Sequence, residues 1–115
     1  VTDAILGAVA LGDIGMHFPD SDEEWKDANS LAFLQRAQAL AHGAGYGVSS
    51  LDATVILERP KLKNFRLQIR ESLASALALP LECVSVKFKT AERVGPVGEG
   101  LSCEAQAVVV VMLIS

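Results

Sequence analysis

The feature that most limits the fold is an apolar run near the end of the sequence, Ala107 to Ile114, which reads AVVVVMLI. It is far shorter than the roughly 20 apolar residues that a membrane helix needs. Its consecutive valines are β-branched, and such side chains pack well on a pleated surface. We therefore expect a buried strand here, and a fold with a β-sheet at its core.

Two further segments predict strands. Residues 83–89, CVSVKFK, alternate at period two, which places Val84, Val86 and Phe88 on one side of a half-buried strand. Residues 49–57, SSLDATVIL, combine β-branched residues with rough alternation. A glycine-rich turn, RVGPVGEG, joins the strand at residues 83–89 to the final strand, Ser102 to Leu113. The sequence therefore predicts a hairpin between these two strands.

Three segments predict helices. Residues 2–11 are apolar at helical spacing and end at Gly12, and residues Ser30 to Ala41 follow a capping residue, Asn29 or Ser30, and stop at HGAGYG. The third helix runs from about Leu62 to Leu79, before Pro80. One face of it is apolar at spacings of three and four: Leu62, Phe65, Ile69, Leu73 and Leu77.

This order of elements predicts an α+β fold, a mixed sheet with helices packed on one face. With 115 residues, 50% of them hydrophobic, the chain can build one compact core, so we expect a single domain over residues 1–115. We expect neither a membrane span nor a signal peptide. The net charge of -4 and scattered basic residues also argue against nucleic acid as a partner.

The two cysteines, Cys83 and Cys103, lie in strand-like apolar runs, which predicts reduced core thiols in a cytosol-like compartment. The chain has only two histidines. His42 falls at a helix end, where an imidazolium meets carbonyl groups favourably, so we expect a structural role for it. Together these residues cannot supply a closed zinc site.

The stretch GDIGMHFPDSD, residues 12–22, is rich in groups that can bind ligands. Asp13, Asp20 and Asp22 could ligate a divalent cation or accept hydrogen bonds from substrate hydroxyls. In the simpler interpretation, Asp20 or Ser21 caps a short helical turn. His17 is a metal ligand, a proton carrier or a loop residue bonded to the backbone, and the sequence favours the last.

A second candidate site is the segment KTAE, Lys89 to Glu92, at the end of a predicted strand. The hydroxyl of Thr90 could donate to a phosphoryl oxygen, and Glu92 could hold a magnesium ion that bridges phosphates. A solvated loop in which Glu92 pairs with Arg93 fits the sequence of this segment equally well. The residues alone leave both interpretations open.

Four stretches together resemble one family in the same order: the segment through GDIGMHFPDSD, ERPKL, VSVKFKTAE and GEGLSCEAQAVVV. The family is 2-C-methyl-D-erythritol 2,4-cyclodiphosphate synthase, a lyase of the non-mevalonate (methylerythritol phosphate) pathway of isoprenoid and terpenoid biosynthesis. The resemblance implies a homotrimer with sheets around a central channel and active sites between subunits. It also implies conversion of 4-diphosphocytidyl-2-C-methyl-D-erythritol 2-phosphate into the cyclic diphosphate and CMP, by attack of the substrate's own 2-phosphate on its β-phosphorus.

The resemblance also implies roles for particular residues. Thr90 would stabilise the transition state, and Glu92 would bind magnesium or manganese between the phosphates. The substrate-binding residues form three segments, at the methylerythritol end, around the cytosine and at the diphosphate: Asp13, Ile14, Gly15, Phe18, Pro19, Asp20, Ser21 and Asp22; Leu57, Pro60, Lys61, Leu62 and Lys63; and Lys89, Thr90, Ala91 and Glu92. The segments in one site would come from adjoining subunits.

The chain departs from the family pattern in two places. The family's zinc ligands, an Asp and two His, would match positions before Val1, so the zinc site is incomplete here and neither His17 nor His42 replaces it. We therefore expect sequence upstream, and a 115-residue chain that is weak or inactive alone. The turn GPVGEG is two residues shorter than its commoner form and lacks an arginine, which leaves one phosphate contact unassigned.

Two alternatives to a monofunctional cyclase follow from these departures. One is a non-catalytic trimeric scaffold that keeps a cytidine-nucleotide pocket without the zinc site. The other is the cyclase half of a fusion with, or a partner of, the preceding cytidylyltransferase. The resemblance implies a bacterial cytoplasm or a plastid stroma as the location.

Overall fold

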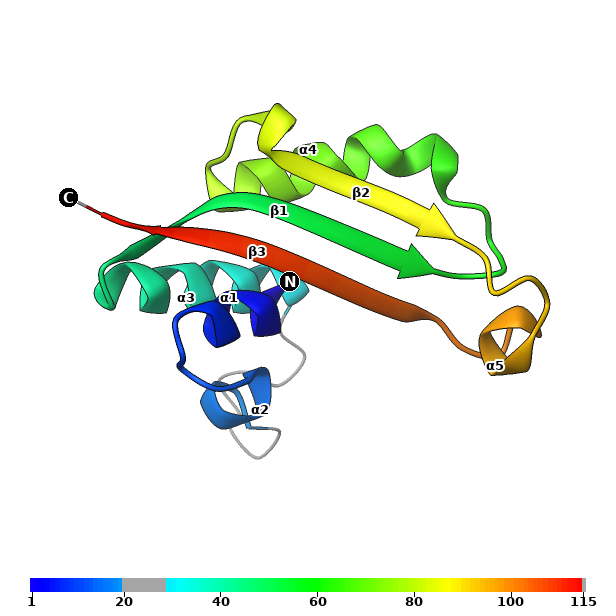
Figure 1. Ribbon diagram of the computed structural model, residues 1–115, viewed down its shortest axis with the longest axis horizontal. Coiled ribbons are helices and arrows are strands. Elements are labelled where there is room, and N and C mark those ends of the chain that lie inside the picture. The colour runs from blue at the N-terminus through cyan, green and yellow to red at the C-terminus, as the bar shows by residue number, and fades with distance from the viewer. Residues whose placement is uncertain (20–28, 115) are drawn as a thin grey trace.

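Within the described residues, 1–19 and 29–114 of a computed structural model, three strands form one sheet in the order β2-β1-β3 (Figure 1). The elements run in the order α1 (Thr2–Ala8), α2 (Ile14–His17), α3 (Ser30–Gly43), β1 (Tyr46–Ile56), η2 (Lys63–Phe65), α4 (Arg66–Leu77), η3 (Leu81–Cys83), β2 (Val84–Lys89), α5 (Gly95–Gly98) and β3 (Glu104–Leu113).

The sheet is mixed, as expected for the α+β class. Central strand β1 pairs in parallel with β2, with Leu51 opposite Val84, and antiparallel with β3, with Leu51 opposite Val109. The predicted hairpin of β2 and β3 is wrong, because β1 lies between them. The chain reaches β2 through α4, which is the crossover that a parallel pair requires, and the segment after β2 then passes the end of β1 to begin β3 on the other edge.

The core lies between the sheet and the three longer helices, α1, α3 and α4. Leu51 of β1 and Val84 and Val86 of β2 are buried against a set of helix residues: Ile5, Leu6, Leu34, Ala37, Ala41, Ala74 and Leu77. The alternate residues of β2 and β3 point the other way and are exposed, among them Lys87 and Val110. The helices therefore cover one face of the sheet. None of the helices in the described residues has the length and apolarity needed to cross a membrane.

Several boundaries differ from the sequence predictions for local reasons. Helix α1 ends at Ala8 rather than residue 11, because Ala10 and Gly12 turn the chain with φ of 59° and 94°. The long helix begins as η2 and becomes α-helical at Arg66, and it stops before Pro80 because Ala78 adopts a left-handed conformation, φ 54°. Helix α3 is confirmed, with the Asn29 side chain accepting the Leu31 N–H as its cap.

The two cysteines are free, as predicted, but they are not both in the core. Cys83 is partly buried at the end of η3, just before β2, whereas Cys103 is exposed. The prediction of a buried thiol is wrong for Cys103, because β3 begins one residue later, at Glu104.

Candidate functional site: a basic cavity at the ends of β1 and β2

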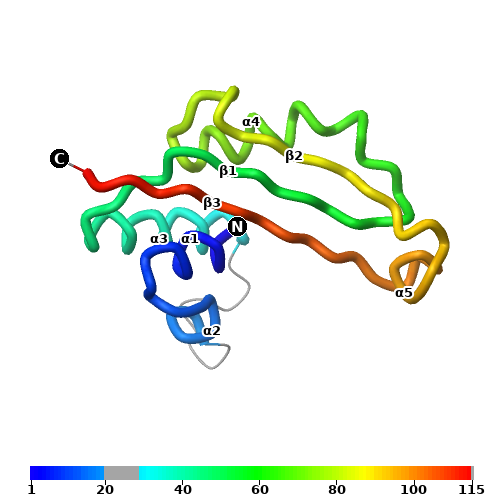
Figure 2. The backbone as a smooth tube through the Cα atoms, viewed as in Figure 1, coloured from blue at the N-terminus to red at the C-terminus, as the bar shows by residue number. Residues whose placement is uncertain are grey.

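The carboxyl ends of the parallel strands β1 and β2 bring two predicted site segments together. β1 ends at Ile56 and β2 at Lys89, in register with each other. One step further on, the Leu57 N–H donates to the Lys89 carbonyl at 3.0 Å. The turn that begins at Leu57 and the segment that begins at Lys89 are therefore held side by side, next to α5 (Figure 2).

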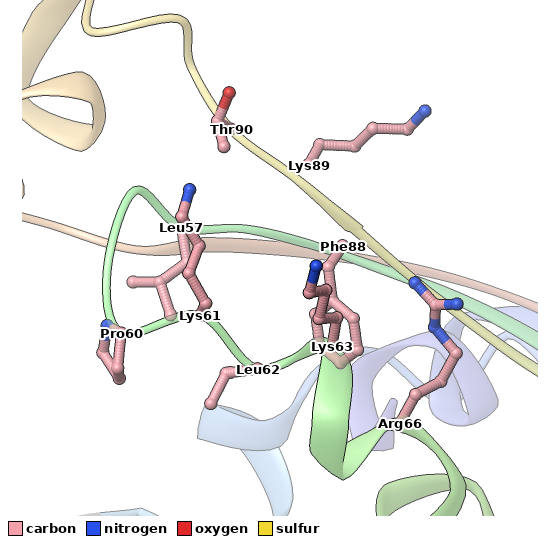
Figure 3. Close-up of a pocket in the computed structure, with 9 residues that line it drawn as sticks. All are labelled: Leu57, Pro60, Lys61, Leu62, Lys63, Arg66, Phe88, Lys89 and Thr90. Atoms are coloured by element: carbon pink, nitrogen blue, oxygen red, sulfur yellow. The ribbon is translucent and has the colours of Figure 1, made fainter.

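These segments and the first turn of α4 surround a cavity of about 180 Å³ (Figure 3). Its lining residues are Leu57, Pro60, Lys61, Leu62, Lys63, Arg66, Phe88, Lys89 and Thr90. Seven of these nine residues are predicted from the sequence, and they include all five predicted residues of the turn Leu57 to Lys63. Ala91 and Glu92 are not among the lining residues but follow directly after Thr90.

The cavity combines apolar walls with positive charge. Leu57, Pro60, Leu62 and Phe88 supply the apolar surface, and four basic side chains surround it, while none of the described lining residues is acidic. The whole chain carries a net charge of -4, so this positive charge is local. Such a site can accept a flat apolar group together with an anion, as in a nucleotide.

Sequence reasoning missed two residues of the cavity, Arg66 and Phe88. The guanidinium carbon of Arg66 lies 5.5 Å from the centroid of the Phe88 ring, which is a cation–π contact. Both had a signal in the sequence. Arg66 lies four residues after Leu62, and Phe88 precedes Lys89 on the inward side of the alternating strand.

The segment after β2 forms a tight turn around Glu92. The Glu92 N–H donates to Thr90 Oγ1 at 3.3 Å, and Thr90 Oγ1 lies 3.5 Å from Glu92 Oε1. Glu92 and Arg93 both have positive φ, 51° and 62°, and Val94 N–H closes the turn onto the Ala91 carbonyl at 3.0 Å. Left-handed geometry costs a non-glycine residue roughly 1–2 kcal/mol, and such strained residues cluster at functional sites.

The described residues show no ion pair between Glu92 and Arg93, which was the pair expected if KTAE were only a solvated loop. The Arg93 N–H donates instead to Glu58 Oε1 at 3.1 Å. The exposed carboxylate of Glu92 thus remains beside the Thr90 hydroxyl. The two functional groups that the resemblance implies for the diphosphate are neighbours.

The segment around Asp13 is a short helix rather than a loop. Asp13 is the N-cap of α2, and its Oδ1 accepts the Met16 N–H at 3.1 Å. The Ile14 N–H donates to Asp3 Oδ1 at 2.7 Å, which ties this helix to α1. His17 Nε2 lies 2.6 Å from the Leu11 carbonyl oxygen, so the backbone-bonded alternative describes His17.

The segment continues into the core through Phe18, which is buried with its ring 5.0 Å from that of Phe33. Pro19 follows and is exposed. Asp20, Ser21 and Asp22 lie outside the described residues. α2 lies far from α5, so the chain does not bring Asp13 to Pro19 together with the basic cavity (Figure 1).

The described residues differ in how well they suit the two metals implied by the resemblance. Magnesium is commonly held by one or two carboxylates and completed by substrate phosphates, and the exposed Glu92 beside Thr90 fits that arrangement. Zinc needs three or four protein ligands. The described part of the chain contains no group of three His, Cys, Asp or Glu side chains that could hold a metal, so it does not fit zinc.

A family model described as the YgbB family matches residues 1–112. The chain belongs to this family. Among its curated relatives, 2-C-methyl-D-erythritol 2,4-cyclodiphosphate synthase of Solibacter usitatus is 65% identical over 95% of this chain and 69% of its own length. The enzyme of the same name from Gloeobacter violaceus is 52% identical, over 95% of this chain and 67% of its own. The bifunctional enzyme IspD/IspF of Hyphomonas neptunium is 54% identical over 93% of this chain and 29% of its own.

Several solved structures share the fold of this chain. A structure of 2C-methyl-D-erythritol-2,4-cyclodiphosphate synthase matches with a TM-score of 0.89 at 37% identity, over 96% of this chain and 71% of that one. Plasmodium falciparum IspF in complex with CDP matches with a TM-score of 0.86 at 32% identity, over 99% of this chain and 68% of that one. Bifunctional IspDF from Campylobacter jejuni matches with a TM-score of 0.93 at 34% identity, over 98% of this chain and 31% of that one.

These similarities confirm the resemblance noted in the sequence, and with it the enzyme class, a lyase of non-mevalonate isoprenoid biosynthesis. They do not favour the non-catalytic scaffold, because the similar proteins are named as synthases. Both monofunctional and bifunctional relatives occur, and this chain spans about two thirds of the former and under a third of the latter.

Proposed function

We propose that the protein converts 4-diphosphocytidyl-2-C-methyl-D-erythritol 2-phosphate into 2-C-methyl-D-erythritol 2,4-cyclodiphosphate and CMP. The observation that carries this proposal is the basic cavity, where the turn from Leu57 and the segment from Lys89 meet. A nucleoside diphosphate needs an apolar pocket for its base next to cations for its phosphates, and this cavity offers both. A relative of the same fold has been solved with CDP.

The cytidine end of the substrate is assigned to the turn Leu57 to Lys63. Pro60 and Leu62 offer apolar contact to the base, and Lys61 and Lys63 offer charge to the phosphates. Arg66 adds a fixed cation, because its contact with Phe88 restricts the guanidinium to one side of the cavity. Lys89 adds another where β2 ends.

The reacting diphosphate is assigned to Thr90 and Glu92. The substrate's 2-phosphate is the nucleophile, so the chain must hold two phosphorus groups in line and offset their charge. The Thr90 hydroxyl is a donor for an oxygen of the β-phosphate as charge develops there. Glu92 would hold magnesium or manganese, which would offset the negative charge of the diphosphate. The described residues do not fit zinc, and none of the roles proposed for them depends on it.

The methylerythritol end is assigned to Asp13, Ile14, Gly15 and the segment from Phe18 to Asp22 of an adjoining subunit in a homotrimer. Two observations support this division. α2 lies far from the carboxyl ends of β1 and β2, where the cavity of the same chain is found. The outward face of β3 also exposes apolar side chains that a partner subunit can cover. In this trimer the sheets surround a central channel. We place the protein in a bacterial cytoplasm or a plastid stroma, as a free cyclase or fused to the cytidylyltransferase.

The decisive experiment compares Thr90→Ala with Thr90→Ser in the protein supplied with zinc and magnesium. We expect wild type to release CMP from the diphosphocytidyl substrate, and Thr90→Ala to lower kcat by roughly a hundredfold, as loss of one oriented donor to a developing charge does. CDP binding and assembly should be unchanged. Thr90→Ser keeps the hydroxyl and should recover most of kcat.

Two outcomes would contradict the proposal. Normal turnover by Thr90→Ala would remove Thr90 from the mechanism. A wild-type protein that binds CDP but releases no CMP would favour the scaffold alternative.

A further inference from the structure

Two residues that the proposed mechanism does not use, Glu58 and Arg59, connect the nucleotide-binding turn to the segment after β2. Glu58 Oε1 accepts the Arg93 N–H at 3.1 Å. The Arg59 guanidinium, through Nη2, donates to the Glu99 carbonyl at 3.1 Å. Both bonds join parts of the chain that are far apart in sequence, and both lie next to a site segment.

The segment after β2 is packed closely around these bonds. Gly98 is buried, and a Cβ there would lie 2.3 Å from the Arg93 carbonyl carbon, so the segment folds back onto its own turn. A Cβ on Gly100 would lie 2.8 Å from Arg59 Nη2. Glycine at position 98 lets the backbone approach Arg93 closely, and glycine at position 100 lets it approach the Arg59 guanidinium. A second cavity lies between the two segments, lined by Glu58, Arg59, Lys61, Arg93, Gly98 and Glu99.

The turn that Glu58 contacts has a backbone conformation that its residue types do not favour. Glu92 and Arg93 are consecutive left-handed residues without glycine, and such residues persist when surrounding contacts determine them. Within the turn, the Val94 N–H bonds to the Ala91 carbonyl and the Glu92 N–H bonds to Thr90 Oγ1. The Arg93 N–H is the donor of this turn that reaches outside it, and its partner is the Glu58 carboxylate.

We propose that Glu58, assisted by Arg59, is a positioning residue that holds the Glu92–Arg93 turn against the nucleotide-binding turn. It touches neither substrate nor metal, and it acts through the backbone of Arg93. Its effect is to fix the Thr90 hydroxyl and the Glu92 carboxylate relative to the pocket that holds the cytidine. This inference rests on the proposed function, because it assigns those two groups to the diphosphate.

The kinetic test uses Glu58→Ala and Glu58→Gln in the protein with its metals. Glu58→Ala removes the acceptor, and we expect kcat to fall roughly tenfold, since misplaced catalytic groups cost rate more than binding. The Kd for CDP should stay within about twofold of wild type, because Glu58 acts on the rate of the reaction and does not contact the nucleotide. Glu58→Gln keeps an oxygen that can accept the Arg93 N–H and should restore most of kcat. The matched control is Glu82→Ala, an exposed glutamate at the opposite end of β2.

A readout independent of turnover is hydrogen exchange of the Arg93 amide in the same variants. We expect protection in wild type and Glu58→Gln, and faster exchange in Glu58→Ala, at matched thermal stability. Wild-type kcat in Glu58→Ala, or unchanged exchange at Arg93, would overturn the positioning role. If wild type itself shows no turnover, the proposed function fails, while exchange at Arg93 still decides whether Glu58 holds the turn.

Discussion

Asp13 is the N-cap of α2, and its carboxylate is also the group we propose as an acceptor for a substrate hydroxyl. One oxygen, Oδ1, bonds to the Met16 N–H. Among the described residues no hydrogen bond uses the second oxygen, and this is the oxygen that we assign to the ligand. A single residue therefore has a local structural task and a proposed binding task, and substitutions can separate the two.

Asp13→Ser keeps a capping oxygen but removes the carboxylate. We expect its melting temperature to match wild type, because serine caps helices about as well as aspartate, while the KM for the substrate rises. Asp13→Ala loses both, and should also lose roughly 1 kcal/mol of stability. Calorimetry and steady-state kinetics of both variants measure this. An unchanged KM in Asp13→Ser would remove Asp13 from the substrate site.

Arg66 gives a second prediction at the scale of one side chain. Arg66→Ala removes a cation from the cavity and its contact with Phe88, so we expect the Kd for CDP to rise by roughly threefold to tenfold, the worth of one such contact. Titration calorimetry with CDP measures the change. The control is Arg36→Ala, an exposed arginine on α3, which should bind CDP as wild type does. Equal binding by both variants would exclude Arg66 from nucleotide recognition.

The residue types predicted much of the candidate site, because the functional group of each side chain can be read directly from the sequence. A threonine and a glutamate at a strand end indicated phosphate and metal chemistry, and the structure keeps Thr90 and Glu92 within 3.5 Å. Their backbone was not predictable, because nothing in the letters KTAER announces two left-handed residues. That conformation depends on Glu58, which is distant in sequence. Asp13 caps α2, whereas the cap predicted at Asp20 or Ser21 lies outside the described residues.

At the scale of elements, α4 ends in a way that its sequence does not favour. Ala78 has φ 54° at the helix C-cap, where glycine is the usual residue. We expect Ala78→Gly to raise the free energy of unfolding by roughly 0.5 to 1 kcal/mol. Ala76→Gly, inside the same helix, should lower it by roughly 1 kcal/mol. Denaturant unfolding of both variants measures the difference, and a destabilised Ala78→Gly would contradict this account of the helix end.

The short helix α5 tests the close packing of the segment after β2. In Gly98→Ala the new Cβ would meet the Arg93 backbone, so we expect a loss of roughly 1–3 kcal/mol, as overpacking costs. Gly7→Ala, where the Cβ has open space in α1, should gain roughly 0.5 to 1 kcal/mol instead. Thermal unfolding distinguishes the two. Equal stability of Gly98→Ala and wild type would mean that this turn is not tightly fixed.

Element types were predictable and their partners were not. Periodicity identifies a strand by the residues that face the core, as the buried Val84 and Val86 and the partly buried Phe88 show. It does not say which edge of which neighbour completes the backbone hydrogen bonds. A glycine-rich turn favoured a hairpin of β2 and β3, but β1 offers two edges, and each of those strands takes one.

At the scale of the whole molecule, the uncovered face of the sheet is the strongest reason to expect an assembly. Val108, Val110 and Met112 of β3 are 66%, 51% and 63% exposed on one face. Apolar side chains gathered in this way usually meet a partner. Neither the trimer nor the single-domain assignment of residues 1–115 follows from one chain, and both stay predictions.

The trimer gives a direct test. Val110→Glu places a charge in the proposed interface, and we expect the protein to pass from trimer to monomer at micromolar concentration, because burying an unpaired charge costs several kcal/mol. Light scattering after size-exclusion chromatography measures the mass. The control is Leu67→Glu on α4, also exposed, which should stay trimeric. A trimeric Val110→Glu would place the interface elsewhere.

The central position of β1 has a consequence for how the chain folds. Leu51 pairs with Val84 on one side and with Val109 on the other, so its second partner is far more distant in sequence. Distant pairings form late, because a long loop must close first. During synthesis on the ribosome, the unit β1, α4 and β2 can assemble while β1 still exposes one edge to other nascent chains. We expect the β3 side of this strand to be where aggregation begins when folding is slow.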